Sequence, residues 1–269
     1  MSCTNFGQLT VLADLPNLLK EVSGIETVSN SDLIWMLNDG GNKSELYALD
    51  QKGTIKKVIK INAKNHDWED LASDTLGNLY IGDLGNNTNN RTNLVILKVH
   101  GADLSTDKKV EIERINFKYP NQKKFPPKRN QRHFDSESFF FYNDSLYIFT
   151  KSRVKNKFGK TNLYKIPAKR GNHTAIYINS FESCKDLECW ITSADISNDG
   201  KKVVLINHKS AWVFTNFKGD DFFSGEVQEF PFEADLSQKE GVCFKNENTI
   251  YITDEYTHGS GGNLYEFSL

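Results

Sequence analysis

The chain has 269 residues, of which 38% are hydrophobic and 25% charged, so it can bury a full core without a partner and we expect a monomer. Its formal net charge is −2, from 33 basic and 35 acidic side chains, and such a balance gives no overall field that favours nucleic acid or an anionic membrane. No apolar run approaches the roughly 18 residues that a transmembrane helix needs.

The N-terminus carries a small residue before a cysteine, Ser2-Cys3, followed by a polar stretch. Bacterial lipoprotein signals end in this way, so one interpretation is a lipid anchor at Cys3 and a periplasmic or cell-surface location; the alternative is an ordinary cytosolic start. Cys184 and Cys189 lie five positions apart and could close a small disulfide loop, as suits an oxidising compartment. Alternatively, they are two free thiols in a surface loop.

Short runs of β-branched and aromatic residues recur between clusters of Gly, Asn and Asp, and helical periodicity is almost absent. A first strand is expected at 8–13. Five segments then align without gaps, each followed by a turn, a stronger apolar strand and a third strand that often contains Leu-Tyr. In chain order these segments are 21–25, 67–71, 135–139, 192–196 and 238–242. A fourth strand, such as 54–61, usually completes the unit.

A unit of about 45 residues suits one four-stranded propeller blade. The second and third units are longer and carry loop insertions; the first insertion, near 120–134, contains the basic run 123–129. The last unit has three strands, and the strand at 8–13 can supply the fourth, which closes the ring and removes exposed sheet edges. We therefore predict an all-β fold: a single five-bladed β-propeller domain over residues 1–269. Six blades would need a sixth inner segment, and none is found.

The third position of the aligned segments carries oxygen donors in most blades. It reads Ser23, Glu69, Glu137, Ala194 and Glu240. Carboxylates gathered around one axis repel each other unless they are protonated or bind a cation. Oxygen donors without Cys or His suit a hard ion such as Ca²⁺. The alternative is that these side chains cap backbone amides or contact buried waters.

Several motifs around these positions match a known pattern. They are Glu21-Val22-Ser23, Glu69 followed by the run 79–85, Glu137 followed by Thr161-Asn162-Leu163, and Glu240-Gly241-Val242. In these motifs the chain resembles the calcium-activated nucleotidases, the salivary-type apyrases, which are five-bladed propellers with a central Ca²⁺. The resemblance implies Ca²⁺ bound by Ser23, Glu69, Glu137 and Glu240, with Ser193 or Ala194 supplying a hydroxyl or a carbonyl.

The chain also departs from that family. The turn at 38–42 lacks the arginine that serves nucleotide hydrolysis there, and 86–88 replaces a further family motif, which puts nucleotide specificity in doubt. The Trp68-Glu69-Asp70 motif and the later Gly82-Asp83-Leu84-Gly85 also resemble a group of uncharacterised bacterial secreted propellers, for which no activity is implied.

Polar residues that follow the second strands are the remaining candidates. Asp39 and Asp83 are predicted catalytic carboxylates, as general bases or water-mediated metal contacts. The alternative is turn-forming residues. Four cationic residues could form a rim that binds phosphoryl oxygens, and the alternative is scattered solvated charge. These predicted substrate-binding residues are Arg91, Lys151, Arg153 and His208.

Two functions follow from these candidates. The first is a Ca²⁺-dependent hydrolase of phosphorylated or otherwise anionic small molecules. The second is a non-catalytic, surface-anchored propeller that binds a ligand or a protein, with Ca²⁺ in a structural role. Fold alone does not choose between them.

Overall fold

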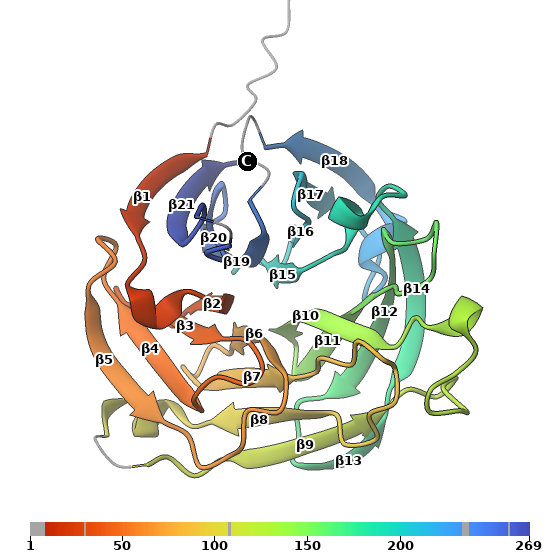
Figure 1. Cartoon of the computed structure of the whole chain (residues 1–269), viewed down its shortest axis with the longest axis horizontal. Helices are drawn as coiled ribbons and strands as arrows, with labels where there is room; N and C mark the ends of the chain where they lie inside the picture. The colour runs from red at the N-terminus through yellow and green to blue at the C-terminus, as the bar shows by residue number, and fades with distance from the viewer. Residues whose placement is uncertain (1–8, 30, 107–108, 233–236, 258) are drawn as a thin grey trace, which may run out of the picture.

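The computed structural model describes residues 9–29, 31–106, 109–232, 237–257 and 259–269. Five antiparallel sheets surround a common axis, which confirms the predicted five-bladed β-propeller (Figure 1). Cys3, the predicted lipid-anchor position, lies outside the described residues. None of the helices in the described ranges is long and apolar enough to cross a membrane.

Each blade is a meander whose first strand lies nearest the axis and whose last strand lies outermost (Figure 1). Blade 1 contains β2 (Val22–Thr27), β3 (Ile34–Asn38), β4 (Glu45–Leu49) and β5 (Ile55–Lys60), and blade 2 contains β6 (Trp68–Ser73), β7 (Leu79–Asp83), β8 (Val95–Val99) and β9 (Glu113–Lys118). Blade 3 contains β10 (Asp135–Tyr142), β11 (Ser145–Lys151), β12 (Lys160–Pro167) and β14 (Ile176–Glu182). Blade 4 contains β15 (Ser193–Ile196), β16 (Val203–Ile206), β17 (Ser210–Thr215) and β18 (Glu226–Pro231). Blade 5 contains β19 (Lys239–Asn246), β20 (Thr249–Asp254), β21 (Asn263–Ser268) and β1 (Thr10–Asp14).

The ring closes through its two ends. Strand β1 pairs antiparallel with β21, with Thr10 opposite Glu266 and Asp14 opposite Asn263. This confirms the closure predicted from residues 8–13. Because the outer strand of the last blade comes from the start of the chain, unfolding either end exposes the edge of blade 5.

One outer strand was not predicted. β13 (Gly171–Thr174) lies in the connection between β12 and β14 of blade 3, yet it pairs in parallel with β9 of blade 2. It covers the backbone groups on the outer edge of β9, which would otherwise be an unpaired sheet edge. The insertion that precedes blade 3 runs from the end of β9 to β10 and includes the 3-10 helix η3 (Arg129–Gln131). Its basic residues Lys123 and Lys124 are exposed.

Apolar side chains form five clusters, one at each junction between neighbouring blades. Between blades 1 and 2, for example, Trp35 and Leu46 meet Trp68 and Ile81. Cys243 is buried in the cluster that joins blade 5 to blade 1, as expected for a small core residue. Each blade thus buries its apolar faces against both neighbours, and the ring needs all five to complete its core.

The five inner strands contact each other in a closed ring, β2–β6–β10–β15–β19. Side chains link their backbones: the Ser23 hydroxyl donates to the Glu69 carbonyl, and Thr192 Oγ1 donates to the Lys239 carbonyl at 2.6 Å. We call the end of the axis where these strands begin the upper end, and the end where they finish the lower end.

Candidate functional site

We call the residues at the third position of the five aligned segments, where oxygen donors were predicted, the column residues. In four of the five blades a β-bulge falls at the column residue, at the upper end. In β2, β6, β10 and β19 the pairing with the second strand shifts at Ser23, Glu69, Glu137 and Glu240. In β15 the pairing is regular, with Ala194 opposite Leu205. A bulged residue drops out of the ladder, and its side chain is redirected. Four blades therefore use the same local device to turn the column residue away from the sheet.

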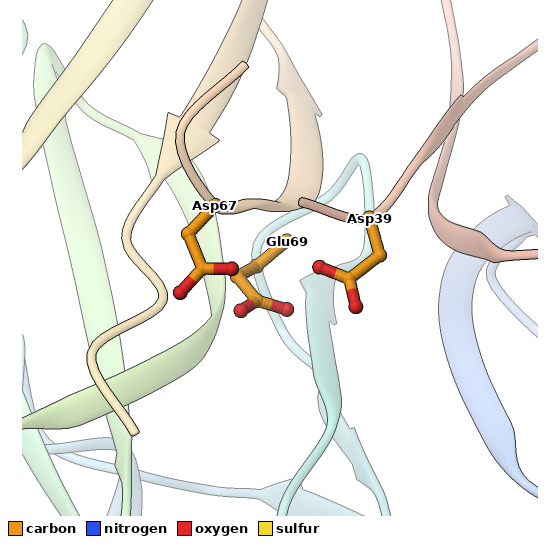
Figure 2. Close-up of side chains that lie close together, drawn as sticks. All are labelled: Asp39, Asp67 and Glu69. Carbon is orange, nitrogen blue, oxygen red and sulfur yellow. The ribbon is translucent and has the colours of Figure 1, made fainter. Parts of the chain in front are cut away.

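Three carboxylates converge beside the axis: Asp39 after β3, Asp67 before β6, and Glu69 within β6. One ligand oxygen from each lies within 4.8 Å of the others, and the side chains point toward a common space (Figure 2). Glu69 is 7% exposed, and among the described residues none hydrogen-bonds to its carboxylate. We call these three residues the acidic trio.

The trio has unusual electrostatics. Burial, together with repulsion from Glu137 and Asp39, raises the pKa of Glu69 well above its usual range. Burial and the Asp67 and Glu240 carboxylates raise the pKa of Asp39 to about 6. Burial also raises the pKa of Asp67, although Arg91 opposes the shift. Three acids this close either share protons or bind a cation.

Two glycines leave room for the trio. A Cβ atom at Gly85 would overlap Glu69 Oε1 and the Asp67 carboxylate, and a Cβ at Gly40 would overlap Asp67 Oδ1. The backbone at these two positions therefore approaches the carboxylates as only glycine allows. A space bounded by carboxylate oxygens and backbone, without Cys or His in the group, fits a hard divalent cation.

The second column carboxylate, Glu137, contacts bases instead of acids. It forms ion pairs with Lys151 and with Arg153, the latter at 3.0 Å, and Arg153 Nε also binds Asp135 Oδ2 at 2.5 Å. Burial raises the pKa of Glu137 to about 8, against the effect of Lys151. Burial alone would lower the pKa of Lys151, but Glu137 and Glu240 raise it. The Trp190 ring lies beneath both bases, with Arg153 Cζ 4.6 Å from its centroid and Lys151 Nζ 5.0 Å from it.

The other predicted metal ligands do not converge on one point, and those with polar side chains contact different protein groups. Glu240 Oε1 lies 3.3 Å from His208 Nε2. The Ser193 hydroxyl donates to Asp70 Oδ2 at 3.1 Å and accepts the N–H of Val242 at 3.0 Å. Ser23 is engaged with a carbonyl, as described above, and the Ala194 side chain is buried. Of the predicted set Ser23, Glu69, Glu137, Ser193, Ala194 and Glu240, the acidic trio includes only Glu69.

Asp83, a predicted catalytic residue, is 1% exposed and bound on both sides. Its Oδ1 accepts from Arg91 at 2.7 Å, and its Oδ2 lies 3.0 Å from His66 Nδ1. Arg91 also donates to the Gly85 carbonyl at 2.6 Å. The predicted catalytic Asp83 and the predicted substrate-binding Arg91 therefore pair with each other, and Arg91 holds the loop that carries Gly85.

Sequence reasoning missed Asp67 and His66 as site residues. A signal for Asp67 was present, because it stands in the aligned segment 67–71, only two positions before Glu69. The four predicted rim residues Arg91, Lys151, Arg153 and His208 do lie at the upper end, each beside a protein carboxylate.

Of the two alternatives left open for Cys184 and Cys189, the structure has the disulfide, which lies directly before Trp190. The Cys189 side chain is buried, and the Trp190 indole N–H donates to the Ser152 carbonyl at 2.5 Å. Because Trp190 supports Lys151 and Arg153, the disulfide loop helps to fix the basic side of the upper end.

No protein-family model matches the chain, and no curated protein matches it in sequence. Among solved structures, a gluconolactonase from Xanthomonas campestris is 9% identical, with 98% of this chain and 90% of that chain covered and a TM-score of 0.53. A streptogramin B lyase is 12% identical, with 98% of each chain covered and a TM-score of 0.50. At such identities the likeness concerns the fold alone, and it agrees with the architecture described above: the chain is a β-propeller.

Proposed function

We propose that this propeller binds a divalent cation, Ca²⁺, at the acidic trio of Asp39, Asp67 and Glu69. The observation that carries the proposal is Glu69, a buried carboxylate without a hydrogen bond among the described residues, facing two further carboxylates. Burying negative charge in this way is unfavourable unless a cation compensates it. Carboxylate oxygens are the ligands that Ca²⁺ prefers.

We further propose that the site hydrolyses phosphorylated or otherwise anionic small molecules. Ca²⁺ takes about six to eight oxygen ligands, so three carboxylates leave positions for water and for a substrate oxygen. When bound, the ion would supply a Lewis acid for that oxygen. In the chain itself, Gly40 and Gly85 leave space for the carboxylates of the trio. The Trp190 ring supports Lys151 and Arg153 at the same end of the axis.

One observation favours the non-catalytic alternative. The bases expected to bind an anionic substrate are already paired: Lys151 with Glu137, Arg153 with Asp135, and Arg91 with Asp83. A paired base offers less attraction to an incoming anion than a free one. In this alternative the ion joins blades 1 and 2, and the upper end binds a ligand or a protein without turning it over.

Calcium titration by calorimetry tests the ion site. We expect one Ca²⁺ per chain, and Glu69→Gln should weaken the affinity about 10-fold to 100-fold because it removes a charged ligand. Asp50→Asn is the matched control. Asp50 is an acid of blade 1 outside the trio, and it pairs with Lys56 at 2.9 Å. The Ca²⁺ affinity of this variant should stay at the wild-type value. Equal affinities for wild type and Glu69→Gln would rule out the trio.

Turnover decides between the two functions. The wild type is assayed on a panel of phosphoesters, nucleotides and other anionic small molecules, with Ca²⁺ and with EDTA. The hydrolase proposal requires turnover that EDTA abolishes and that Asp39→Asn lowers together with the Ca²⁺ affinity. Stoichiometric Ca²⁺ without turnover on this panel would favour the non-catalytic propeller.

A further inference from the structure

A second candidate site lies at the other end of the axis. A cavity of about 610 Å³ opens at the lower end, and its wall includes the last residues of all five inner strands. They include Glu26 of β2, Ser73 of β6, Tyr142 of β10, Ile196 of β15 and Lys245 of β19. A volume of this size is in the range of sites for small organic ligands.

The wall of the cavity is strongly acidic. Its carboxylates are Glu26, Asp32, Asp74, Asp144 and Asp195. Lys245 is the basic residue of this wall within the described part of the chain, and it is neutralised by Glu266 at 2.6 Å. Electrostatics therefore favour a cationic ligand over an anionic or a neutral one.

Two of these carboxylates are buried, and no base among the described residues pairs with them. Glu26 is 5% exposed; its Oε1 accepts the N–H of the adjacent Thr27 at 2.6 Å, and no side chain in the described ranges hydrogen-bonds to it. Asp195 is 8% exposed and accepts the N–H groups of Ile196 and Phe244 at 2.7 and 2.6 Å. Burial, together with repulsion from Asp195, raises the pKa of Glu26 well above its usual range. Glu26 thus borders the cavity as a buried acid to which no other described side chain hydrogen-bonds.

The arrangement suits an extended organic cation better than a metal ion. In the part of the chain that the structure describes, the acidic trio at the upper end is the group whose ligand atoms converge within 4.8 Å. The lower acids come from blades 1 to 4 and are distributed around the wall instead.

We propose that the lower-end cavity binds a small aliphatic polyamine, with Glu26 and Asp195 as the anchoring carboxylates. Ammonium groups spaced along a flexible chain can reach carboxylates that are too far apart to share one ion. The proposal concerns a site separate from the acidic trio, so either can fail without the other.

Spermidine is the probe, and binding is measured by calorimetry on the full chain at low ionic strength. We expect one saturable site, at least 10-fold weaker in Glu26→Gln and in Asp195→Asn. Asp32→Asn, on an exposed residue of the same wall, should weaken binding about 2-fold to 5-fold and serves as the readout if Asp195→Asn fails to fold. Asp39→Asn at the upper end should leave spermidine affinity unchanged, and 1,8-octanediol, a chain without amines, should not bind.

Three outcomes would overturn the proposal. One is the absence of saturable spermidine binding to the wild type. Another is a loss of affinity in Asp39→Asn equal to that in Glu26→Gln, which would place the amine at the upper end. The third is that Ca²⁺ displaces spermidine completely from the wild type and that the lower-end variants weaken Ca²⁺ binding as much as spermidine binding, which would make the cavity a metal site.

Discussion

The two ends of the propeller axis hold buried acids in different ways. At the upper end, Glu137 contacts Lys151 and Arg153, and Glu69 faces two carboxylates at short range. At the lower end, Glu26 and Asp195 accept backbone N–H groups and have no ion pair among the described residues. Because a buried charge needs compensation, the upper end places protein bases beside Glu137, whereas the lower end offers Glu26 and Asp195 no base among the described residues and leaves that role to a bound cation. One fold thus offers two chemically distinct sites on one axis.

The largest expected effect on the free energy of unfolding comes from removing a base that pairs with a buried acid at the upper end. Lys151 and Glu137 are both buried, so Lys151→Met leaves Glu137 with Arg153 as its remaining base. Removing one partner of a buried ion pair costs about 3 kcal/mol or more in the free energy of unfolding. Urea denaturation at pH 7 measures the loss.

The double variant Lys151→Met/Glu137→Gln is the control for this prediction. It removes the Glu137 carboxylate together with the Lys151 ammonium, and we expect it to be more stable than Lys151→Met alone. If the double variant is as unstable as the single one, the loss comes from packing around Lys151 and not from charge compensation.

The pH dependence of the free energy of unfolding tests the buried acids of the lower end. Burial raises the pKa of Asp195 to about 7, in a neighbourhood that also holds Glu26, Asp70 and Cys243. The folded state then binds a proton that the unfolded state releases above about pH 4. The contribution of Asp195 to the free energy of unfolding is therefore greatest at low pH and falls as the pH rises from about 4 to about 7, with a slope of up to about 1.4 kcal/mol per pH unit.

Asp195→Asn should flatten this fall by up to about 4 kcal/mol across the window, measured by urea denaturation at several pH values in the presence of EDTA. Asp39 and Glu137 have raised pKa values too, of about 6 and about 8, so part of the slope remains. Asp50→Asn is the control, because the Lys56 side chain lowers the pKa of that half-buried acid and so moves its titration below the window. An unchanged slope in Asp195→Asn would mean that Asp195 is already ionised at pH 5.

A smaller change tests the space around the acidic trio. The methyl group of Gly85→Ala would overlap the Glu69 and Asp67 carboxylates, so we expect Ca²⁺ affinity to fall about 10-fold, which is about 1.4 kcal/mol. Gly219→Ala places its methyl group in open space at a positive φ of 56°, and its effect should be limited to backbone strain, with the Ca²⁺ affinity unchanged. If Gly85→Ala binds Ca²⁺ as tightly as the wild type, the ion lies elsewhere.

The architecture was accessible from sequence because it rests on repetition. The five aligned segments became β2, β6, β10, β15 and β19, and the strand at the N-terminus completed blade 5. The partners of the column residues were less accessible. Lys151 lies opposite Asp135 across the β10–β11 ladder, and the bulge between Ser136 and Ser138 turns Glu137 toward it. A register shift of one residue leaves no mark in the composition of the strand, so the alignment alone predicted a ring of carboxylates where the structure has ion pairs and a trio.

The lower-end cavity had no signal of this kind. Its acids come from a strand end, from turns and from the middle of a repeat, at Glu26, Asp32 and Asp195, and they share no alignment column. Only the folding of separate blades around one axis brings them to one wall. Features built from one repeated position are visible in sequence, and features built from unrelated positions need coordinates.

The smallest expected effect on the free energy of unfolding is that of a Glu→Gln substitution at the lower end, compared with the same substitution at the upper end. Burial and the nearby Asp195 raise the pKa of Glu26, which favours its neutral form, and Glu26→Gln replaces it with a neutral group of the same shape. The Thr27 N–H keeps an oxygen acceptor, so the free energy of unfolding should change by less than about 1 kcal/mol. Glu137→Gln removes a carboxylate from Lys151 and Arg153 and leaves a buried ammonium without its partner, which is the costlier change. Urea denaturation of the two variants side by side measures the difference. Equal losses would mean that the side chain of Glu26 makes contacts as costly to remove as the ion pairs of Glu137.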